Sequence, residues 1–342
     1  MTRGASKARW GILLVVTVLV VGAAGAYAAT AFERFQESKT AASTARVASG
    51  VAALKGGTVL FRNTAPGQGY GMIGTVSLAD PAGERSLAPV ACDRVYGTTQ
   101  DVVCLKTNRG LVTGFEADLL NPEWQQTRSW AVPGIPNRTR MSRDGSLVAT
   151  TVFVTGHSYG TTGFVTATSI MEAHGGGGTG NLEDFALMVN GTRITAVDRN
   201  IWGVTFAPDQ SDTFYATAAS SGRIWLVKGS IAARTLTAIH DGVECPSLSP
   251  DGTRIAYKKN TGSALAAHWR VAVLDLATGQ ETVLSEPRSV DDQIEWLDDR
   301  TLLYGLARDG AAGDSDVWQI NADPASSASL YIEHAWSPSV VR

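Results

Sequence analysis

The sequence predicts an all-β protein, a six-bladed β-propeller preceded by an N-terminal transmembrane or signal helix. Three observations lead to this fold class. The chain of 342 residues contains 36 glycines without a collagen period or a low-complexity tract, which indicates many tight turns between short strands. A hairpin-like motif recurs along the chain. Residues 10–31 form one uninterrupted stretch without charge.

The recurring motif consists of an apolar residue, a turn of Pro, Asp and Gly type, and a short apolar run. The clearest copy starts at Leu248, and other copies start at Met141, Phe206 and Trp296. Proline presets φ, aspartate caps its own turn and glycine accepts a positive φ, so each copy predicts a β-hairpin. A third strand follows each hairpin, and a fourth follows the clearest copy near residues 281–284. Four strands in about 45 residues are typical of a propeller blade.

Two further units complete the predicted ring. Residues 95–105 form a fifth copy with a degenerate turn, and residues 57–63 give a second strand with no first strand before it. The missing strand is expected at the C-terminus, where a Trp-Ser-Pro run at Trp336 repeats the start of the motif. We therefore expect the propeller to span residues 56–342, with the C-terminal strand closing the first blade and removing two exposed sheet edges.

Residues 1–31 predict a signal anchor or a signal peptide. Three basic residues precede the uncharged stretch, and positive charge on this flank keeps the N-terminus in the cytoplasm. About 20 apolar residues cross a bilayer as a helix, although an Ala-Tyr-Ala run at Ala26 also fits a cleavage site. Both alternatives place the propeller on the extracytoplasmic side, tethered to the cell membrane or secreted. Residues 32–55, rich in Ala, Ser, Thr and charge, predict a stalk or linker.

The repeat resembles that of a known family. Residues 249–257 (SPDGTRIAY) and the Trp-Ser-Pro run at Trp336 are similar to TolB-type propeller repeats, and the resemblance extends over residues 56–342. It implies an exported propeller of a kind commonly used for protein contacts. TolB carries a separate α/β domain before its propeller, whereas this chain has an anchor and a stalk there. TolB's own partners therefore do not follow from the resemblance.

Three cysteines bear on the compartment and on the fold. Cys92 and Cys104 are predicted on the first and second strands of one hairpin, and antiparallel pairing about a turn near Thr98 places them opposite each other. In an oxidising compartment a cross-strand disulfide is expected, with two unpaired core thiols as the alternative. Cys245 is interpreted as a buried thiol rather than a nucleophile.

One blade is longer than the others, and we place its excess at residues 156–184. A loop of this length in a compact repeat is often functional. A surface hairpin with a flexible tip and a metal or ligand site are the two alternatives. The candidate residues in it are His157, Tyr159 and His174.

Catalytic signals in the sequence are weak. Ser158 lies in a G-x-S-x-G pattern, but its flanks are strand-like on both sides, whereas a nucleophile elbow joins a strand to a helix. The sequence contains no CxxC, HExxH, Walker or dinucleotide motif, so no metal and no cofactor is predicted. The formal net charge is -3 and no long basic cluster occurs, so no nucleic-acid partner is expected. The aspartates that recur at the turn position are interpreted as structural: Asp144, Asp209, Asp251 and Asp299.

A partner is expected at the mouth of the central channel, where the loops that lead into the innermost strands converge. Alignment of the motif copies places six candidate residues there: Arg138, Trp202, Glu244, Asp291, Asp292 and Glu333. The loops at this mouth are polar and net acidic, which suits a basic peptide, a polyol or a cation. Rim loops that are polar only because they are solvated are the alternative.

These features favour a binding or scaffold module with a protein or peptide partner at the cell envelope. The alternative is a propeller enzyme of lyase or glycoside hydrolase type, in which Asp292 and Glu244 would be the acid–base pair. A mouth carboxylate with a strongly raised pKa beside a substrate-sized pocket would favour the enzyme. An open and solvated acidic mouth would favour binding.

Overall fold

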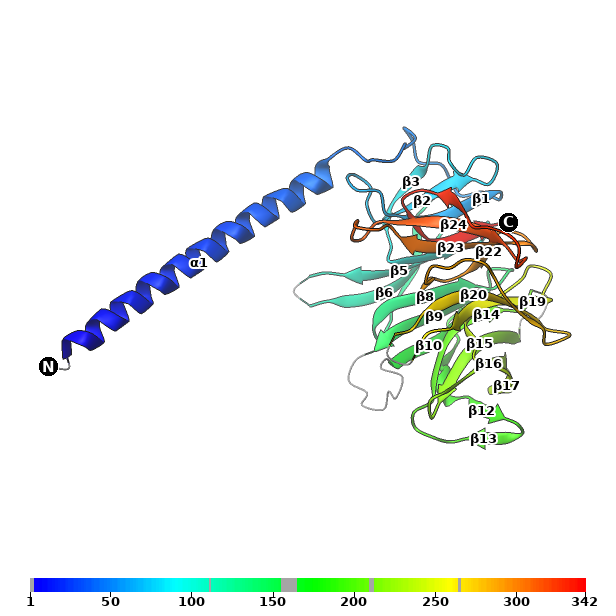
Figure 1. Cartoon of the computed structure of the whole chain (residues 1–342). Helices are drawn as coiled ribbons and strands as arrows, with labels where there is room; N and C mark the ends of the chain where they lie inside the picture. Colours follow the sequence, from blue (N-terminus) through cyan, green and yellow to red (C-terminus); the bar gives the residue numbers. More distant parts are fainter. Residues whose placement is uncertain (1–2, 111, 155–164, 209–211, 264–265) are drawn as a thin grey trace. The chain divides into compact units, whose positions relative to one another are not determined.

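The computed structural model describes residues 3–110, 112–154, 165–208, 212–263 and 266–342 (Figure 1). They form two compact units, Met1–Thr44 with Pro66–Tyr70, and Ala45–Ala65 with Gly71–Arg342. The first unit contains helix α1 (Arg3–Thr40). Within α1, Trp10–Glu33 is a stretch of 24 residues with mean hydropathy 2.4, long and apolar enough to cross a membrane.

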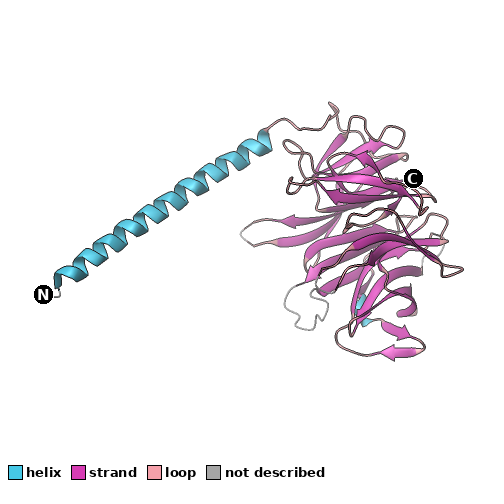
Figure 2. Ribbon diagram, viewed as in Figure 1, coloured by secondary structure: helices cyan, strands magenta, loops and turns pink. Residues whose placement is uncertain are grey.

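The second unit is the predicted six-bladed propeller, and its regular elements are β-strands joined by loops, with one short 3-10 helix among the described residues (Figure 2). Each blade has four antiparallel strands, ordered from the innermost to the outermost. Blade 1 contains β26 (Ala335–Val341), β1 (Thr58–Asn63), β2 (Met72–Ser77) and β3 (Ser86–Ala91). Blade 2 contains β4 (Arg94–Gly97), β5 (Val102–Asn108), β6 (Gly114–Leu120) and β7 (Gln126–Ala131). Blade 3 contains β8 (Ile135–Met141), β9 (Leu147–Val154), β10 (Val165–Glu172) and β11 (Gly178–Asn181).

The remaining three blades follow in chain order. Blade 4 contains β14 (Asn200–Phe206), β15 (Thr213–Ser220), β16 (Arg223–Ser230) and β17 (Thr235–Asp241). Blade 5 contains β18 (Glu244–Leu248), β19 (Arg254–Asn260), β20 (Trp269–Asp275) and β21 (Glu281–Val283). Blade 6 contains β22 (Glu295–Trp296), β23 (Thr301–Ala307), β24 (Ser315–Asn321) and β25 (Ser329–Ile332).

The ring closes as the sequence predicted. Strand β26, at the C-terminus, pairs antiparallel with β1, from Thr58 opposite Val341 to Asn63 opposite Ala335. Val341 and Ala335 are fully buried. The first blade is therefore completed by the two ends of the propeller chain, and β1 is not left as an open sheet edge, since β26 pairs with it as the innermost strand.

Two of the recurrent aspartates, Asp251 and Asp144, organise turns, as interpreted from the sequence. In blade 5, Oδ1 of Asp251 accepts hydrogen bonds from Ser249 Oγ and from the backbone N–H of Thr253. Gly252 follows with φ 72°, which glycine adopts without strain. Asp144 holds the corresponding turn of blade 3 by accepting from Ser142 and Ser146, and these hydrogen bonds lower the pKa of its carboxyl.

In blade 6 the turn is held instead by Asp298, which accepts from the backbone N–H groups of Arg300 and Thr301, whereas Asp299 accepts from the N–H of Asp251. Asp209 lies outside the described residues.

The predicted range of the excess, residues 156–184, contains only part of the added elements that the structure describes, and its residues 156–164 lie outside the described residues. Within residues 156–184, β10 and β11 are regular strands of blade 3. The added elements are η1 (Leu182–Asp184) and a hairpin of β12 (Ala186–Val189) and β13 (Thr192–Ile194). The hairpin extends the sheet of blade 4, because β12 pairs in parallel with its outermost strand, β17. The spacing between motif copies gives the number of residues added between two innermost strands. It does not show which of these residues form strands of the blade and which form additional elements.

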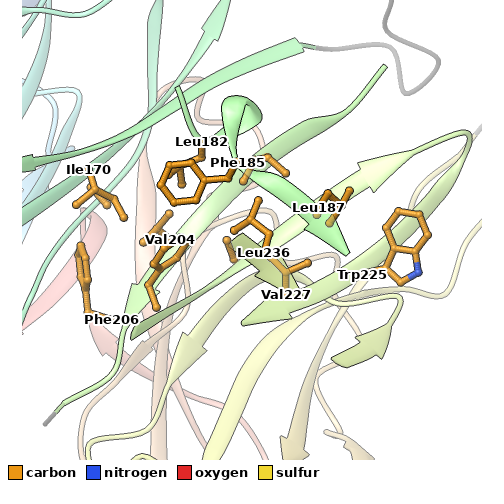
Figure 3. Packing of buried hydrophobic residues seen from close by; sticks show 14 of the residues in the cluster. Ile170, Leu182, Phe185, Leu187, Val204, Phe206, Trp225, Val227 and Leu236 are labelled. Atoms are coloured by element: carbon orange, nitrogen blue, oxygen red, sulfur yellow. The ribbon is translucent and has the colours of Figure 1, made fainter. Parts of the chain in front are cut away.

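The added hairpin is held by apolar packing between blades 3 and 4. Leu182, Phe185 and Leu187 pack against Ile170 of blade 3 and Trp225 of blade 4 in one buried cluster (Figure 3). The rings of Phe185 and Phe214 meet edge to face, with centroids 6.4 Å apart. The segment is therefore an integral part of the core and not a loose surface loop.

The end of the predicted stalk belongs to the propeller unit. The backbone N–H of Ala48 donates to the carbonyl of Arg85, and that of Leu54 donates to the carbonyl of Pro122. Trp124 donates from its indole N–H to the carbonyl of Ala52 at 2.8 Å. These bonds fix residues 45–55 along blades 1 and 2.

The disulfide between Cys92 and Cys104 is present, with the two Cα atoms 5.5 Å apart. Cys104 lies on β5 as predicted, but its strand partner is Val95 rather than Cys92. Cys92 lies in the connection between β3 and β4, so the disulfide ties the link between two blades to β5. Cys245 is a free, buried cysteine, in agreement with its interpretation.

Candidate functional site

The six innermost strands surround the central channel, in the order β26, β4, β8, β14, β18 and β22. We call the end where the connecting loops enter these strands the loop end, and the end where the Pro-Asp-Gly-type turns follow them the turn end. The sequence places its candidate residues at the loop end. The loop end contains several ion pairs, the turn end contains a cavity, and the ion pair of Arg140 with Glu295 lies between the two ends.

A bulge near the loop end recurs in three innermost strands and shows that the sequence-based alignment of the last repeat was shifted. Pairing shifts in β14, β18 and β26 at the position of Gly203, Cys245 and Ser337, which all have positive φ. The Ser337-Pro338 pair is therefore equivalent to Cys245-Pro246, and not to the Ser-Pro pair of the turn motif. With this register Glu333 no longer aligns with the mouth residues of the other blades, and it lies in the short connection between β25 and β26.

At the loop end, Arg94 on β4 forms a buried ion pair with Asp292, with Nη1 and Oδ1 2.7 Å apart. The second oxygen of Asp292 accepts from the backbone N–H of Gly305 at 3.1 Å. Burial, together with the positive charge of the neighbouring Arg138, lowers the pKa of Arg94 to about 10. Two guanidinium groups are thus crowded at this end of the channel.

Asp291 joins the other two cations of the loop end. Its Oδ1 lies 2.5 Å from Nζ of Lys258 and 3.7 Å from Nη2 of Arg138. Burial acts against ionisation of Asp291, but the charge and hydrogen bond of Lys258 and the charge of Arg138 outweigh it and lower the pKa of this carboxyl. The expected open acidic mouth is therefore a balanced set of ion pairs, because Lys258 on the second strand reaches the channel.

Glu244 is the exception among these carboxylates. It lies opposite Lys258 in the β18–β19 pairing and is only 6% exposed. Its side chain makes no hydrogen bond among the described residues, and burial raises its pKa to about 7, with Lys258 opposing that shift. Glu244 therefore takes up and releases a proton near neutral pH.

Two predicted residues lie away from the channel mouth. Trp202 is buried in a small cluster with Ala219 and Cys245, so it offers no aromatic edge to a ligand. Glu333 is exposed and pairs with Arg308, with Oε1 3.2 Å from Nη2. The structure thus brings together Arg138, Glu244, Asp291 and Asp292, but neither Trp202 nor Glu333 with them.

An ion pair crosses the channel between the two ends. Nη1 of Arg140, on β8, lies 2.6 Å from Oε2 of Glu295, on β22. Arg140 also donates from Nη2 to the hydroxyl of Ser247 at 2.9 Å. Both charged side chains are almost completely buried, so this layer fills the channel with satisfied polar groups.

The turn end contains a cavity of about 290 Å³ that sequence reasoning did not identify. All six innermost strands or the turns after them contribute to its wall, and Arg140 and Glu295 lie in it. The other lining residues are Tyr96, Gly97, Thr98, Met141, Ser142, Arg143, Thr205, Phe206, Pro208, Leu248, Ser249, Pro250, Trp296, Val340 and Arg342. The recurrence of the motif was the available signal, since the apolar residue that starts the motif lines the cavity in four blades, as Met141, Phe206, Leu248 and Trp296.

The residues predicted in the insertion are only partly described. His157, Ser158 and Tyr159 lie outside the described residues. His174 lies in the turn between β10 and β11, and its Nε2 is 2.9 Å from Oδ2 of Asp101 in blade 2. Within the part of the chain that the structure describes, no three His, Cys, Asp or Glu side chains gather as metal ligands do.

No protein-family model and no curated protein matches this chain. Among solved structures it is similar to TolB from Acinetobacter baumannii, with a TM-score of 0.57 and 14% identity over 84% of this chain and 67% of that chain. A chain of a nidogen/laminin complex gives a TM-score of 0.54 and 11% identity, over 83% and 98%. Puromycin hydrolase gives 0.50 and 12%, over 84% and 45%. These similarities support a TolB-like propeller fold.

Proposed function

We propose that this protein is a binding module of the cell envelope, held at the outer face of the membrane by its N-terminal segment. The observation that carries the proposal is the turn-end cavity, because all six blades contribute to it. At about 290 Å³ it lies at the small end of ligand pockets, so it suits one side chain or a short peptide segment of a protein partner.

The lining of the cavity indicates the chemistry of that partner. Phe206, Leu248 and Trp296 give it apolar walls. Three arginines face one glutamate among the lining residues, so the cavity carries an excess of positive charge. Arg143 is exposed and has no hydrogen-bond or ion-pair partner in the described part of the chain. We therefore propose an acidic or amphipathic segment as the occupant.

The N-terminal segment and the disulfide support export. The apolar stretch Trp10–Glu33 is long enough to span a bilayer, and basic residues precede it. A structural disulfide between Cys92 and Cys104 is expected in an oxidising compartment. We propose an uncleaved anchor, with a cleaved signal as the alternative. Western blotting of the mature chain with an N-terminal tag distinguishes the two.

Site-specific crosslinking tests the binding proposal. A photoreactive amino acid is placed at Arg143 of the full chain in intact membranes, and at Arg193 on β13 as the control position. We expect one defined adduct from position 143 that is absent from 193. In a competition experiment, an excess of untagged protein without the photoreactive residue should suppress this adduct. An untagged Arg143→Glu variant should compete about tenfold less well, whereas Arg193→Glu, an equal charge change on an exposed strand, should compete as the wild type does. Equal competition by both variants contradicts the proposal.

One observation favours the enzymatic alternative. Glu244, with a pKa near 7, lies at the same end of the channel as Asp292, which is ion-paired with Arg94. A lyase or glycosidase of this kind would lose at least about a hundredfold in kcat with Glu244→Gln. A panel of polysaccharides assayed with the full chain tests this. The cavity is at the opposite end of the channel, which is why binding is proposed first.

A further inference from the structure

The loop end contains two buried cations that share one exposed carboxylate. The side chains of Arg138 and Lys258 are each 6% exposed, whereas that of Asp291 is 69% exposed. Both cations face the same oxygen, Oδ1 of Asp291. Burying a cation is costly unless a partner stabilises it. Asp291 is such a partner for both groups although its side chain is largely exposed; Asp292 and the thiol of Cys245 also act on Arg138, and Lys258 lies over the ring of Trp269.

Arg138 has unused hydrogen-bonding capacity. Its Nη1 donates to the carbonyl and to the side chain of Asn137. Its Nη2 is 3.7 Å from Asp291, which is beyond hydrogen-bond length. Its Nε is buried and without a hydrogen-bond partner among the described residues. The thiol of Cys245 also interacts with this guanidinium. A buried guanidinium with an unpaired Nε is suited to an acceptor with more than one oxygen.

The backbone on either side of Asp291 is anchored, but its side chain is not. Val290 is fully buried in the core, and Asp292 is fully buried in its pair with Arg94. The exposed carboxylate of Asp291 can therefore turn into solvent by side-chain rotation, with no movement of the loop that carries it. Asp292 would stay in place, because it is bound by Arg94 and Gly305.

We propose that Arg138 and Lys258 form an oxyanion-binding site at the loop end, which the carboxylate of Asp291 occupies when no ligand is present. A ligand carboxylate, sulfate or phosphate group displaces Asp291 and takes its place between the two cations. The crowding of Arg94 against Arg138 adds to the attraction for an anion. This site is distinct from the turn-end cavity, so it is independent of the partner proposed there.

Anion binding at this site is expected to depend on pH through Glu244. The charged groups that act on Glu244 are Lys258 on β19 and Asp291 in the loop before β22. Below a pH of about 7 Glu244 is neutral and does not repel the anion; above it, the ionised carboxylate weakens binding. Binding should therefore tighten as pH falls from 8 to 6.

Calorimetric titration of the full chain in detergent micelles tests the site. Sulfate is the first probe, because it stays ionised throughout this pH range. Acetate is titrated in a separate experiment, so that binding of a tetrahedral anion can be compared with binding of a planar carboxylate. We expect Asp291→Asn to bind sulfate about tenfold more tightly than the wild type, since a competing charge is lost. Asp309→Asn, the same change on an exposed hairpin, is the matched control and should bind as the wild type does.

Loss-of-binding variants complete the test. Arg138→Gln and Lys258→Met should each abolish the tight sulfate binding of the Asp291→Asn background, with folding checked by circular dichroism. Glu244→Gln should remove the pH dependence while keeping the affinity seen at pH 6. Equal sulfate affinity in Asp291→Asn and Asp309→Asn overturns the proposal, as does tight binding that survives in folded Arg138→Gln. Arg143→Glu should leave sulfate binding unchanged, so this result is separable from the crosslinking experiment.

Discussion

Arg140 of blade 3 and Glu295 of blade 6 are 155 residues apart in the chain and form an ion pair across the centre of the propeller. The pair is buried and linked to Ser247 of blade 5. Because it joins opposite sides of the ring, it couples blades that share no β-sheet.

Glu295→Ala is expected to lower the free energy of unfolding by about 3–5 kcal/mol, because it leaves Arg140 buried without its partner. Arg140→Met combined with Glu295→Met should cost less than the single change, since no unpaired charge remains. Urea denaturation measures both. Glu123→Ala, at an exposed site, is the control, and a single variant no less stable than this control would show that the pair is unimportant.

Loss of the disulfide is expected to lower the free energy of unfolding by about 2–3 kcal/mol, because the crosslink closes a short loop in the unfolded chain. The comparison is between the wild type and Cys92→Ala with Cys104→Ala. Dithiothreitol should destabilise the wild type by a similar amount and leave the double variant unaffected. A thiol titration of the denatured wild type should give one free group, Cys245. Three free groups would contradict the pairing.

Ring closure is expected to depend on the buried face of β26. Val341→Asp places a charge at a fully buried position of the closing strand and should lower the unfolding midpoint by at least about 10 °C. Ile239→Asp makes a similar change at a half-exposed position on β17, the outermost strand of blade 4 proper, and should shift the midpoint by less than about 3 °C. Differential scanning calorimetry measures both, and equal shifts would argue against closure by β26.

Glu244 is expected to make stability fall as pH rises. Its pKa is raised in the folded state, so the folded protein binds more protons than the unfolded chain between about pH 4.5 and 7. The stabilisation is complete below the unfolded pKa and is lost as pH rises through about 7, with a span of roughly 3 kcal/mol.

The difference in unfolding free energy between wild type and Glu244→Gln, measured by urea denaturation from pH 5 to pH 8, isolates this contribution. Burial also raises the pKa of Glu183 to about 7, so Glu183 titrates in the same pH range. Its contribution is the same in wild type and variant and therefore cancels when the two unfolding free energies are subtracted. Glu123→Gln is the control. A difference curve that is flat across this range would be inconsistent with a buried, proton-binding Glu244.

Much of the fold could be predicted because turn chemistry is local. The Ser249-Pro250-Asp251-Gly252 run contains the groups that make its own turn, so its recurrence reports the blades directly. The hairpin of β12 and β13 lies beyond the predicted bounds of the excess segment, because its position depends on the packing of Leu182 and Phe185 between two blades. Cys92 was assigned to a strand because spacing alone cannot separate a strand from the connection before it.

The candidate site was less predictable than the fold. Glu333 was assigned to the channel mouth because Ser337-Pro338 resembles the turn motif, although this pair forms a bulge like that of Cys245-Pro246. Lys258 was missed because it lies on a second strand, and only the bulged pairing of β18 with β19 brings it opposite Glu244. The turn-end cavity was missed because a cavity depends on what side chains leave unfilled.

The sequence by itself determined the number of blades, the closing strand, the apolar N-terminal helix and the disulfide partners, since each follows from short-range patterns of turn, strand and charge. Only the tertiary structure decided which charges meet. Arg94 with Asp292, Arg138 and Lys258 with Asp291, and Arg140 with Glu295 are pairs between blades. Their geometry depends on bulges and on ring closure. The pKa of a buried group and the strength of its ion pair depend on how far the neighbouring residues exclude water, which is set by the tertiary structure.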